Sequence, residues 1–230
     1  MTEAAKIAKI RHNLKSNDIV KFLEAIAIES TSAKLVWKII NTNNQLDGFN
    51  IYFRPLDGWN LSSTDYKMVT LFNSGTTTYE VNGLLKFTQY EFFLVPFYKT
   101  MEGKPSNSRI VRTLEAVPDA PPTDLEASLI NSTSVLLKWK PPPAGTHNGV
   151  IQCYQIIVKE AGNDSGIVQN VSVVGSNARV NGLTPGSAYW LQLAAATVRG
   201  IGPYTHHATL QLPYVPTHGL DPSTRLLDEN

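Results

Sequence analysis

The chain has 230 residues, of which 42% are hydrophobic and 17% are charged, and its formal net charge is +1 at pH 7. This composition is typical of a folded globular protein, and the near-zero net charge gives no general attraction to nucleic acid or to an anionic membrane. No stretch of the sequence approaches about 18 uninterrupted apolar residues, so we expect no membrane-spanning helix.

The N-terminal residues 1–17 contain the one helical periodicity in the sequence. Apolar positions 4, 7, 8 and 14 would share one side of a short helix, and the interspersed lysines exclude a secretory signal. We interpret Met1 as the start of an excised fragment and residues 1–17 as a linker. The basic side chains could bind sulfated glycans or lipid, although a solvated helix face is the simpler interpretation: Lys6, Lys9, Arg11, Lys15 and Lys21.

The rest of the chain repeats with a period close to 100 residues, which predicts two copies of one domain. In each copy, alternating apolar and polar residues surround a tryptophan, and a leucine stands six residues before a tyrosine. Thirteen residues after each tyrosine comes a glycine, Gly103 or Gly202. We predict that the tryptophan, the leucine and the tyrosine of each copy form the structural core: Trp37, Leu84 and Tyr90 in the first copy, and Trp139, Leu183 and Tyr189 in the second.

Each copy consists of short β-branched and aromatic segments separated by turn residues about every ten positions, which predicts an all-β sandwich. Between the copies, three prolines within residues 114–122 predict a short, semi-rigid spacer. The predicted domains are therefore residues 18–116 and 117–213, followed by a polar tail over residues 214–230.

Sequence signatures of catalysis and metal binding are absent: there is no HExxH, no glycine-rich phosphate loop and no Gly-x-Ser-x-Gly elbow. His206 and His207 would point to opposite faces of a strand, so both rings cannot bind one metal ion. Cys153 is the single cysteine, which excludes an intramolecular disulfide, and a small hydrophobic role in a strand is favoured over a reactive thiol. We predict no enzymatic activity, cofactor, metal or small-molecule substrate.

The landmarks resemble the fibronectin type III family over about residues 18–213. The second copy matches best, through Trp139, the prolines 141–143, the corner from Leu183 to Tyr189, and Gly202-Pro203-Tyr204. The first copy departs in two places, because Trp37 is not followed by prolines and Phe87 replaces the proline of the corner. The resemblance implies two tandem, seven-stranded, immunoglobulin-like sandwiches, with a short N-terminal helix as an addition.

The segment from Phe87 to Thr100, FTQYEFFLVPFYKT, and its continuation to Ala116 are similar to the later fibronectin modules of roundabout (Robo) receptors, particularly the insect ones. This resemblance implies the second and third fibronectin modules of a single-pass, cell-surface axon-guidance receptor, with residues 214–230 leading toward the membrane. In that family Slit binds immunoglobulin domains that are absent here, so these modules would act as spacer and protein-interaction segment.

Two other classes of receptor also contain fibronectin modules. A cytokine receptor would carry disulfides in its first module and Trp-Ser-x-Trp-Ser in its second, and this sequence has neither. Another neuronal cell-adhesion receptor with fibronectin modules remains as the alternative. An extracellular location agrees with four Asn-x-Ser/Thr tripeptides, which we expect at exposed loops or strand edges: Asn60, Asn131, Asn163 and Asn170.

An interaction surface is predicted on the first domain. If Tyr90, Phe92 and Leu94 face the core, strand alternation turns the residues between and beyond them outward. Exposed clusters of aromatic side chains generally mark contacts, so the N-terminal segment, a second receptor chain or another protein would cover this one. The alternative is that long polar neighbours cover it. The cluster comprises Tyr52, Phe93, Val95 and Phe97.

Overall fold

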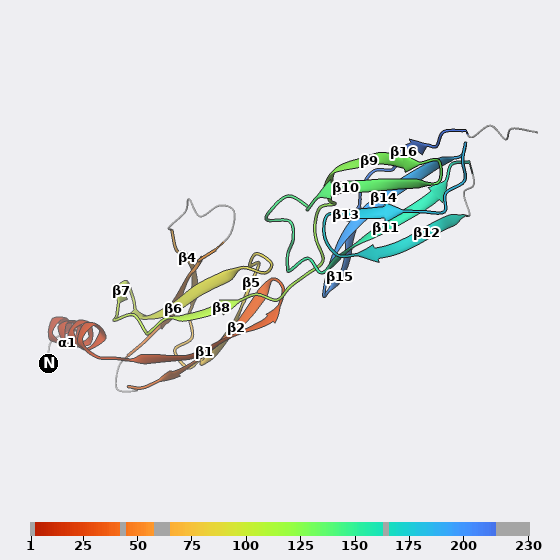
Figure 1. The fold of residues 1–230 in the computed structure, drawn as a ribbon. Helices are drawn as coiled ribbons and strands as arrows, with labels where there is room; N and C mark the ends of the chain where they lie inside the picture. Colours follow the sequence, from red (N-terminus) through yellow and green to blue (C-terminus); the bar gives the residue numbers. More distant parts are fainter. Residues whose placement is uncertain (1–2, 42–44, 58–64, 163–165, 215–230) are drawn as a thin grey trace, which may run out of the picture. The chain divides into compact units, whose positions relative to one another are not determined.

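The computed structural model describes residues 3–41, 45–57, 65–162 and 166–214. Its Cα positions fall into two compact units, of which the first holds residues up to 119 together with 143–152 and 196–202, and the second holds the remainder. Each unit contains a β-sandwich (Figure 1). The prediction of two all-β sandwiches with one short helix is therefore confirmed.

The first sandwich contains two antiparallel sheets, ordered β1-β2-β5 and β4-β3-β6. Two short segments, β7 and β8, pair with successive parts of β6, so together they take the place of a single seventh strand. The elements are α1 (Glu3–Ser16), β1 (Val20–Glu29), β2 (Ser32–Ile39), β3 (Gly48–Pro55), β4 (Lys67–Leu71), β5 (Thr78–Asn82), β6 (Gln89–Tyr98), β7 (Met101–Glu102) and β8 (Arg109–Arg112).

The core of the first sandwich lies between these sheets and follows the period-2 alternation of the strands. Leu35 and Trp37 project inward from β2 and are fully buried. The Trp37 ring meets Phe49 edge-on with their centroids 5.8 Å apart. Leu84 and Tyr90 are also buried, and both belong to the same apolar cluster.

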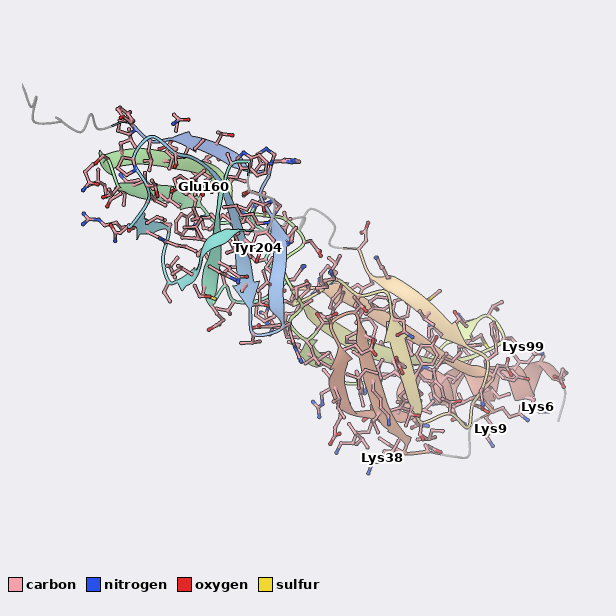
Figure 2. The ribbon with its side chains drawn as sticks, turned by 90° about the vertical axis from the view of Figure 1, so that its right-hand side faces the viewer. Lys6, Lys9, Lys38, Lys99, Glu160 and Tyr204 are labelled. Atoms are coloured by element: carbon pink, nitrogen blue, oxygen red, sulfur yellow. The ribbon has the colours of Figure 1, made fainter. Side chains whose placement is uncertain are left out.

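Helix α1 is present, but of the predicted apolar stripe only Leu14 is buried, and Ile10 is buried beside it. Ala4 and Ala8 are exposed, whereas Ile10 and Leu14 belong to the core cluster of the first sandwich. Residues four apart lie on one face of a helix, and Ile and Leu bury more apolar surface than alanines would. Lys6 and Lys9 lie on the exposed side of α1 (Figure 2).

The contact of α1 with the β7 region depends on a glycine. The carbonyl oxygen of Leu14 accepts a hydrogen bond from the Lys104 amide at 2.8 Å. A Cβ atom at Gly103 would lie 2.9 Å from that oxygen, so a side chain there would displace the helix end. Residues 3–16 are therefore packed onto the first sandwich.

The second sandwich repeats this arrangement, with sheets ordered β9-β10-β13 and β12-β11-β14, and with β15 and β16 both pairing with β14. Trp139 is buried and meets Tyr154 edge-on at 5.3 Å, and Leu183 and Tyr189 are buried with it. The strands are β9 (Thr123–Asn131), β10 (Ser134–Lys140), β11 (Cys153–Glu160), β12 (Ile167–Val173), β13 (Asn177–Val180), β14 (Ala188–Thr197), β15 (Gly200–Tyr204) and β16 (Ala208–Gln211). Across the described residues, no helix has the length and apolar character needed to cross a membrane.

The two buried tyrosines anchor equivalent corners. The Tyr90 hydroxyl accepts a hydrogen bond from the Leu85 amide at 2.9 Å, and the Tyr189 hydroxyl accepts one from the Thr184 amide at 2.9 Å. In both cases the donor stands five residues before the tyrosine. Burial raises the pKa of Tyr90, although the Leu85 hydrogen bond opposes that shift.

We expect Tyr90→Phe and Tyr189→Phe each to lower the free energy of unfolding by about 1 kcal/mol, because the ring stays in place while one backbone donor loses its partner. Urea denaturation followed by circular dichroism would measure this. Tyr90→Leu, which removes the ring as well, should cost distinctly more. Equal stability of Tyr90→Phe and the parent chain would show that the corner hydrogen bond contributes nothing.

Candidate interaction surface

The outer face of the β4-β3-β6 sheet carries the predicted aromatic residues. Tyr52 on β3 stands opposite Phe93 on β6, Asn50 stands opposite Val95, and Gly48 stands opposite Phe97. The register runs from Gly48 to Pro55 without interruption, so Pro96 does not reset the alternation. All four predicted residues therefore face away from the core.

The four residues point away from the core, but not all of them are exposed to solvent. The prediction of an exposed cluster is wrong for Val95 and Phe97. Val95 and Phe97 are only 4% and 5% exposed, and Tyr52 and Phe93 are half-buried. Phe97 lies opposite Gly48, which has no side chain, so the Phe97 ring can lie against the sheet. The Phe72 ring meets it edge-on, with the ring centroids 5.6 Å apart. Phe72 thus covers part of Phe97, while Ile10 and Leu14 of α1 belong to the core cluster.

The exposed part of this surface comes from β4 and its flanking residues, which the sequence analysis missed. Phe72 is 81% exposed, and Met68 and Tyr66 are exposed beside it. The signal was present in the alternation of β4, because Val69 and Leu71 pack against the core and so turn positions 68, 70 and 72 outward. We name the whole surface the aromatic face: Tyr52, Tyr66, Met68, Phe72, Phe93 and Phe97.

Ring stacking holds the aromatic face together. Tyr52 stacks on Phe93 with centroids 5.2 Å apart and an interplanar angle of 11°, and Tyr66 meets the same Phe93 ring edge-on at 5.1 Å. The Arg54 guanidinium lies 4.7 Å from the centre of the Tyr66 ring. Stacked and edge-on pairs of this kind fix side chains in place, which lowers the entropy cost of binding a partner.

Two carboxylates pair with the polar groups around these rings. Glu102 Oε1 accepts hydrogen bonds from the Tyr52 hydroxyl at 2.8 Å and from Asn50 Nδ2 at 2.7 Å. Glu91 Oε2 accepts from the Tyr66 hydroxyl at 3.0 Å and lies 3.0 Å from the Arg54 guanidinium. Partial burial opposes ionisation of Glu91, but the hydrogen bonds from Tyr66 and Arg54 outweigh it and lower the pKa of the carboxyl.

The Tyr52 hydroxyl is expected to lose its proton at a higher pH than an ordinary tyrosine. Partial burial, together with the hydrogen bond to Glu102 and the charge of that carboxylate, raises the pKa of Tyr52 to about 12. A raised pKa means that the folded state favours the neutral phenol, so this contribution to stability is complete below the unfolded pKa of about 10 and disappears as pH rises toward 12.

We therefore expect any stability advantage of the parent chain over Tyr52→Phe to shrink between about pH 10 and pH 12, as measured by urea denaturation at each pH. Glu102→Gln keeps a hydrogen-bond acceptor but removes the charge, and should move the Tyr52 pKa back toward its ordinary value. An advantage that stays constant across this pH range would contradict the assigned hydrogen bond.

The remaining predicted positions are dispersed. Asn131 and Asn170 are exposed, and Asn60 and Asn163 lie outside the described residues. His206 and His207 are exposed, and the His207 ring lies 5.1 Å from that of Trp190. Within the part of the chain that the structure describes, no three His, Cys, Asp or Glu side chains are grouped to hold a metal ion.

Comparisons with known proteins agree with this architecture. The family model "Fibronectin type III domain" matches residues 18–112 and 120–211. The chain is 31% identical over 194 residues to protein sax-3 of Caenorhabditis elegans, covering 82% of this chain and 15% of that protein. It is 32% identical over 186 residues to neogenin of Rattus norvegicus, covering 80% and 13%.

Roundabout homolog 1 of Homo sapiens is 28% identical over 200 residues, which cover 85% of this chain and 12% of that protein. The chain therefore spans only a small part of the length of these relatives. Two family matches cover most of the chain, and each falls on one sandwich. The chain belongs to the fibronectin type III family and contains two consecutive domains of that family.

Proposed function

We propose that this chain is an extracellular, membrane-proximal part of an axon-guidance receptor of the Roundabout kind, and that it contains the second and third fibronectin type III domains of that receptor. The similarity to protein sax-3 and to Roundabout homolog 1 supports this assignment. So does the resemblance of residues 87–116 to Robo modules. The exposure of Asn131 and Asn170 is compatible with a glycosylated, extracellular chain.

In this proposal the two domains, taken as residues 18–116 and 117–213, act as a spacer and a protein-interaction segment, and residues 214–230 lead toward the membrane. Slit would bind domains outside this chain. A sandwich with a packed core offers stable surfaces for contact rather than a reaction site. The alternative, another neuronal cell-adhesion receptor, is kept because neogenin and netrin receptor DCC are also similar to this chain.

The aromatic face carries the proposal of protein interaction. Large aromatic side chains dominate the binding energy of protein interfaces, especially where they are already held in place before binding. Phe72, Met68 and Tyr66 expose apolar surface next to rings that are fixed by stacking. The partner proposed for this face is a second copy of the receptor.

Self-association can be tested on this chain produced as a secreted protein. We expect its average mass in multi-angle light scattering to rise with concentration, and Phe72→Lys and Met68→Lys to abolish that rise. Ile26→Lys is the matched control, because Ile26 is also an exposed apolar residue, placed on the other sheet of the same sandwich. A parent chain that stays monomeric up to high concentration would rule out self-association through this face.

Ligand binding separates the two receptor classes. Immobilised chain is expected to bind neither Slit nor netrin in surface plasmon resonance, because the Slit site of a Roundabout receptor would lie in other domains. Netrin binding would favour the alternative represented by netrin receptor DCC. Binding of Slit to this chain alone would contradict the proposal that Slit binds other domains and that these two domains act as a spacer.

A further inference from the structure

Strand β12 of the second unit is an exposed edge strand of apolar character. It is the terminal strand of the sheet ordered β12-β11-β14, and Figure 1 shows it at the margin of that sheet. Its sequence, IVQNVSV, contains no charged residue and no proline, and Ile167, Val168 and Val171 are exposed. Edge strands of this kind can pair with a strand of another chain through their free backbone groups.

The other edge strands carry the features that normally prevent such pairing. Strands β1, β4, β5, β7, β8, β9 and β13 each contain at least one charged residue, and β15 contains Pro203. Strand β16 has neither, but it is only four residues long. Strand β12 is therefore the seven-residue edge that lacks both a charge and a proline.

Asn170 stands at the middle of β12 and begins the tripeptide Asn170-Val171-Ser172. Its Oδ1 atom accepts a hydrogen bond from Gln155 Nε2 at 2.7 Å, and Gln155 Oε1 accepts one from the Tyr204 hydroxyl at 2.5 Å. Gln155 lies on β11 and Tyr204, which is labelled in Figure 2, lies on β15, so both partners are on the inner side of β12. Asn170 pairs with Ile157, and the alternate residues of β11 are buried, so the Asn170 side chain stands on the outer face of the sheet, where it is exposed.

We propose that Asn170 carries an N-linked glycan, and that this glycan shields the β12 edge from pairing with β12 of a second copy. Nδ2 forms a bond to the anomeric carbon of a lipid-linked diphosphate oligosaccharide. The bond from that carbon to the phosphate oxygen breaks, the lipid diphosphate leaves with the electron pair, and the amide loses one proton. The inference rests on the extracellular location proposed above, since this modification occurs in the secretory pathway.

Strand β12 has no charged residue to prevent edge-to-edge pairing, and the glycan on Asn170 prevents it sterically instead. An antiparallel β12–β12 pair would bring the middles of the two strands together, about 4.8 Å apart, and Asn170 lies at that middle. In such a pair the two Asn170 side chains would stand opposite one another on the same face, with Cβ atoms about 4.5–5.5 Å apart, and two hydrated oligosaccharides cannot both fit at that spacing. Without the glycan, β12 could pair with β12 of a second copy. With the glycan, the edge stays exposed to solvent.

The test uses the chain with an added secretion signal, produced in glycosylating cells, with Phe72→Lys present throughout to silence the aromatic face. Mass spectrometry of the peptide containing Asn170 measures occupancy, and light scattering over a concentration series measures association. Asn170→Gln removes the sugar, and Ser172→Ala removes it while keeping the bond from Gln155. Asn131→Gln, at the other described tripeptide, is the matched control.

We expect a glycan on Asn170 and monomeric parent and Asn131→Gln chains, whereas Asn170→Gln and Ser172→Ala should associate at concentrations lower by about tenfold or more, equivalent to at least about 1.4 kcal/mol. Asn170→Lys also lacks the sugar but restores a charge to the edge, so it should stay monomeric. An unmodified Asn170 beside an occupied Asn131 would overturn the inference, as would monomeric Asn170→Gln and Ser172→Ala.

These outcomes are independent of the proposed receptor class. Because the secretion signal is supplied, Asn170 meets the glycosylation machinery whatever the natural location of the parent protein. A failure of the receptor assignment would appear in the Slit and netrin binding experiment, whereas a failure of edge shielding would appear only in the light scattering of the Asn170 and Ser172 variants.

Discussion

Replacing Trp37 by alanine is expected to lower the free energy of unfolding of the first unit by about 3–5 kcal/mol. The side chain is 1% exposed, is one of the largest fully buried side chains, and packs edge-on against Phe49 at 5.8 Å. Truncation would leave a large cavity between two sheets that cannot close without breaking their strand pairing. The loss is a large share of the roughly 5–15 kcal/mol that holds a domain folded.

Trp37→Phe is the matched variant. Among the described residues, the buried Nε1 atom of Trp37 has no hydrogen-bond acceptor, so phenylalanine would remove an unsatisfied donor while keeping an aromatic ring. We expect it to cost clearly less than alanine. Urea denaturation followed by far-ultraviolet circular dichroism would measure both, with the second unit as an internal reference. If Trp37→Ala unfolded at the same urea concentration as the parent, the core assignment of Trp37 would be wrong.

The second large effect is expected at helix α1, where Leu14→Ala should destabilise the first unit by about 2–5 kcal/mol. Leu14 is fully buried in the core cluster of the sandwich, together with Ile10. Deleting residues 1–17 would remove both side chains and expose the apolar surface beneath them, so it should cost at least as much. Thermal unfolding and urea denaturation of the truncated chain would show it.

Lys9→Ala provides the control for α1, because Lys9 is exposed on the same helix and its replacement should change stability by less than about 0.5 kcal/mol. Comparing Leu14→Ala with Lys9→Ala separates the loss of buried packing from the effect of a substitution anywhere on the helix. If deletion of residues 1–17 left the unfolding of the first unit unchanged, the packing of α1 would contribute nothing to the stability of that unit, as expected of a linker.

The repeat and the alternation around Trp37 and Trp139 were enough to predict two β-sandwiches, because side-chain direction along a strand follows directly from backbone geometry. The same alternation assigned Phe93 and Phe97 to the outer face, where the register of β3 with β6 places them. The period of apolar residues along a strand and the face to which each side chain points depend only on local backbone geometry. The sequence by itself therefore determined them.

Burial was decided only by the tertiary structure, because it depends on what lies over a side chain from other segments. Phe97 is covered by Phe72, a residue 25 positions away that β-sheet pairing brings beside it. Ile10 and Leu14 are selected over Ala4 and Ala8 as the packed stripe of α1 because the sandwich offers apolar surface to that side of the helix. Contacts between distant segments require the chain to close long loops, and no pattern within one strand or helix contains that information.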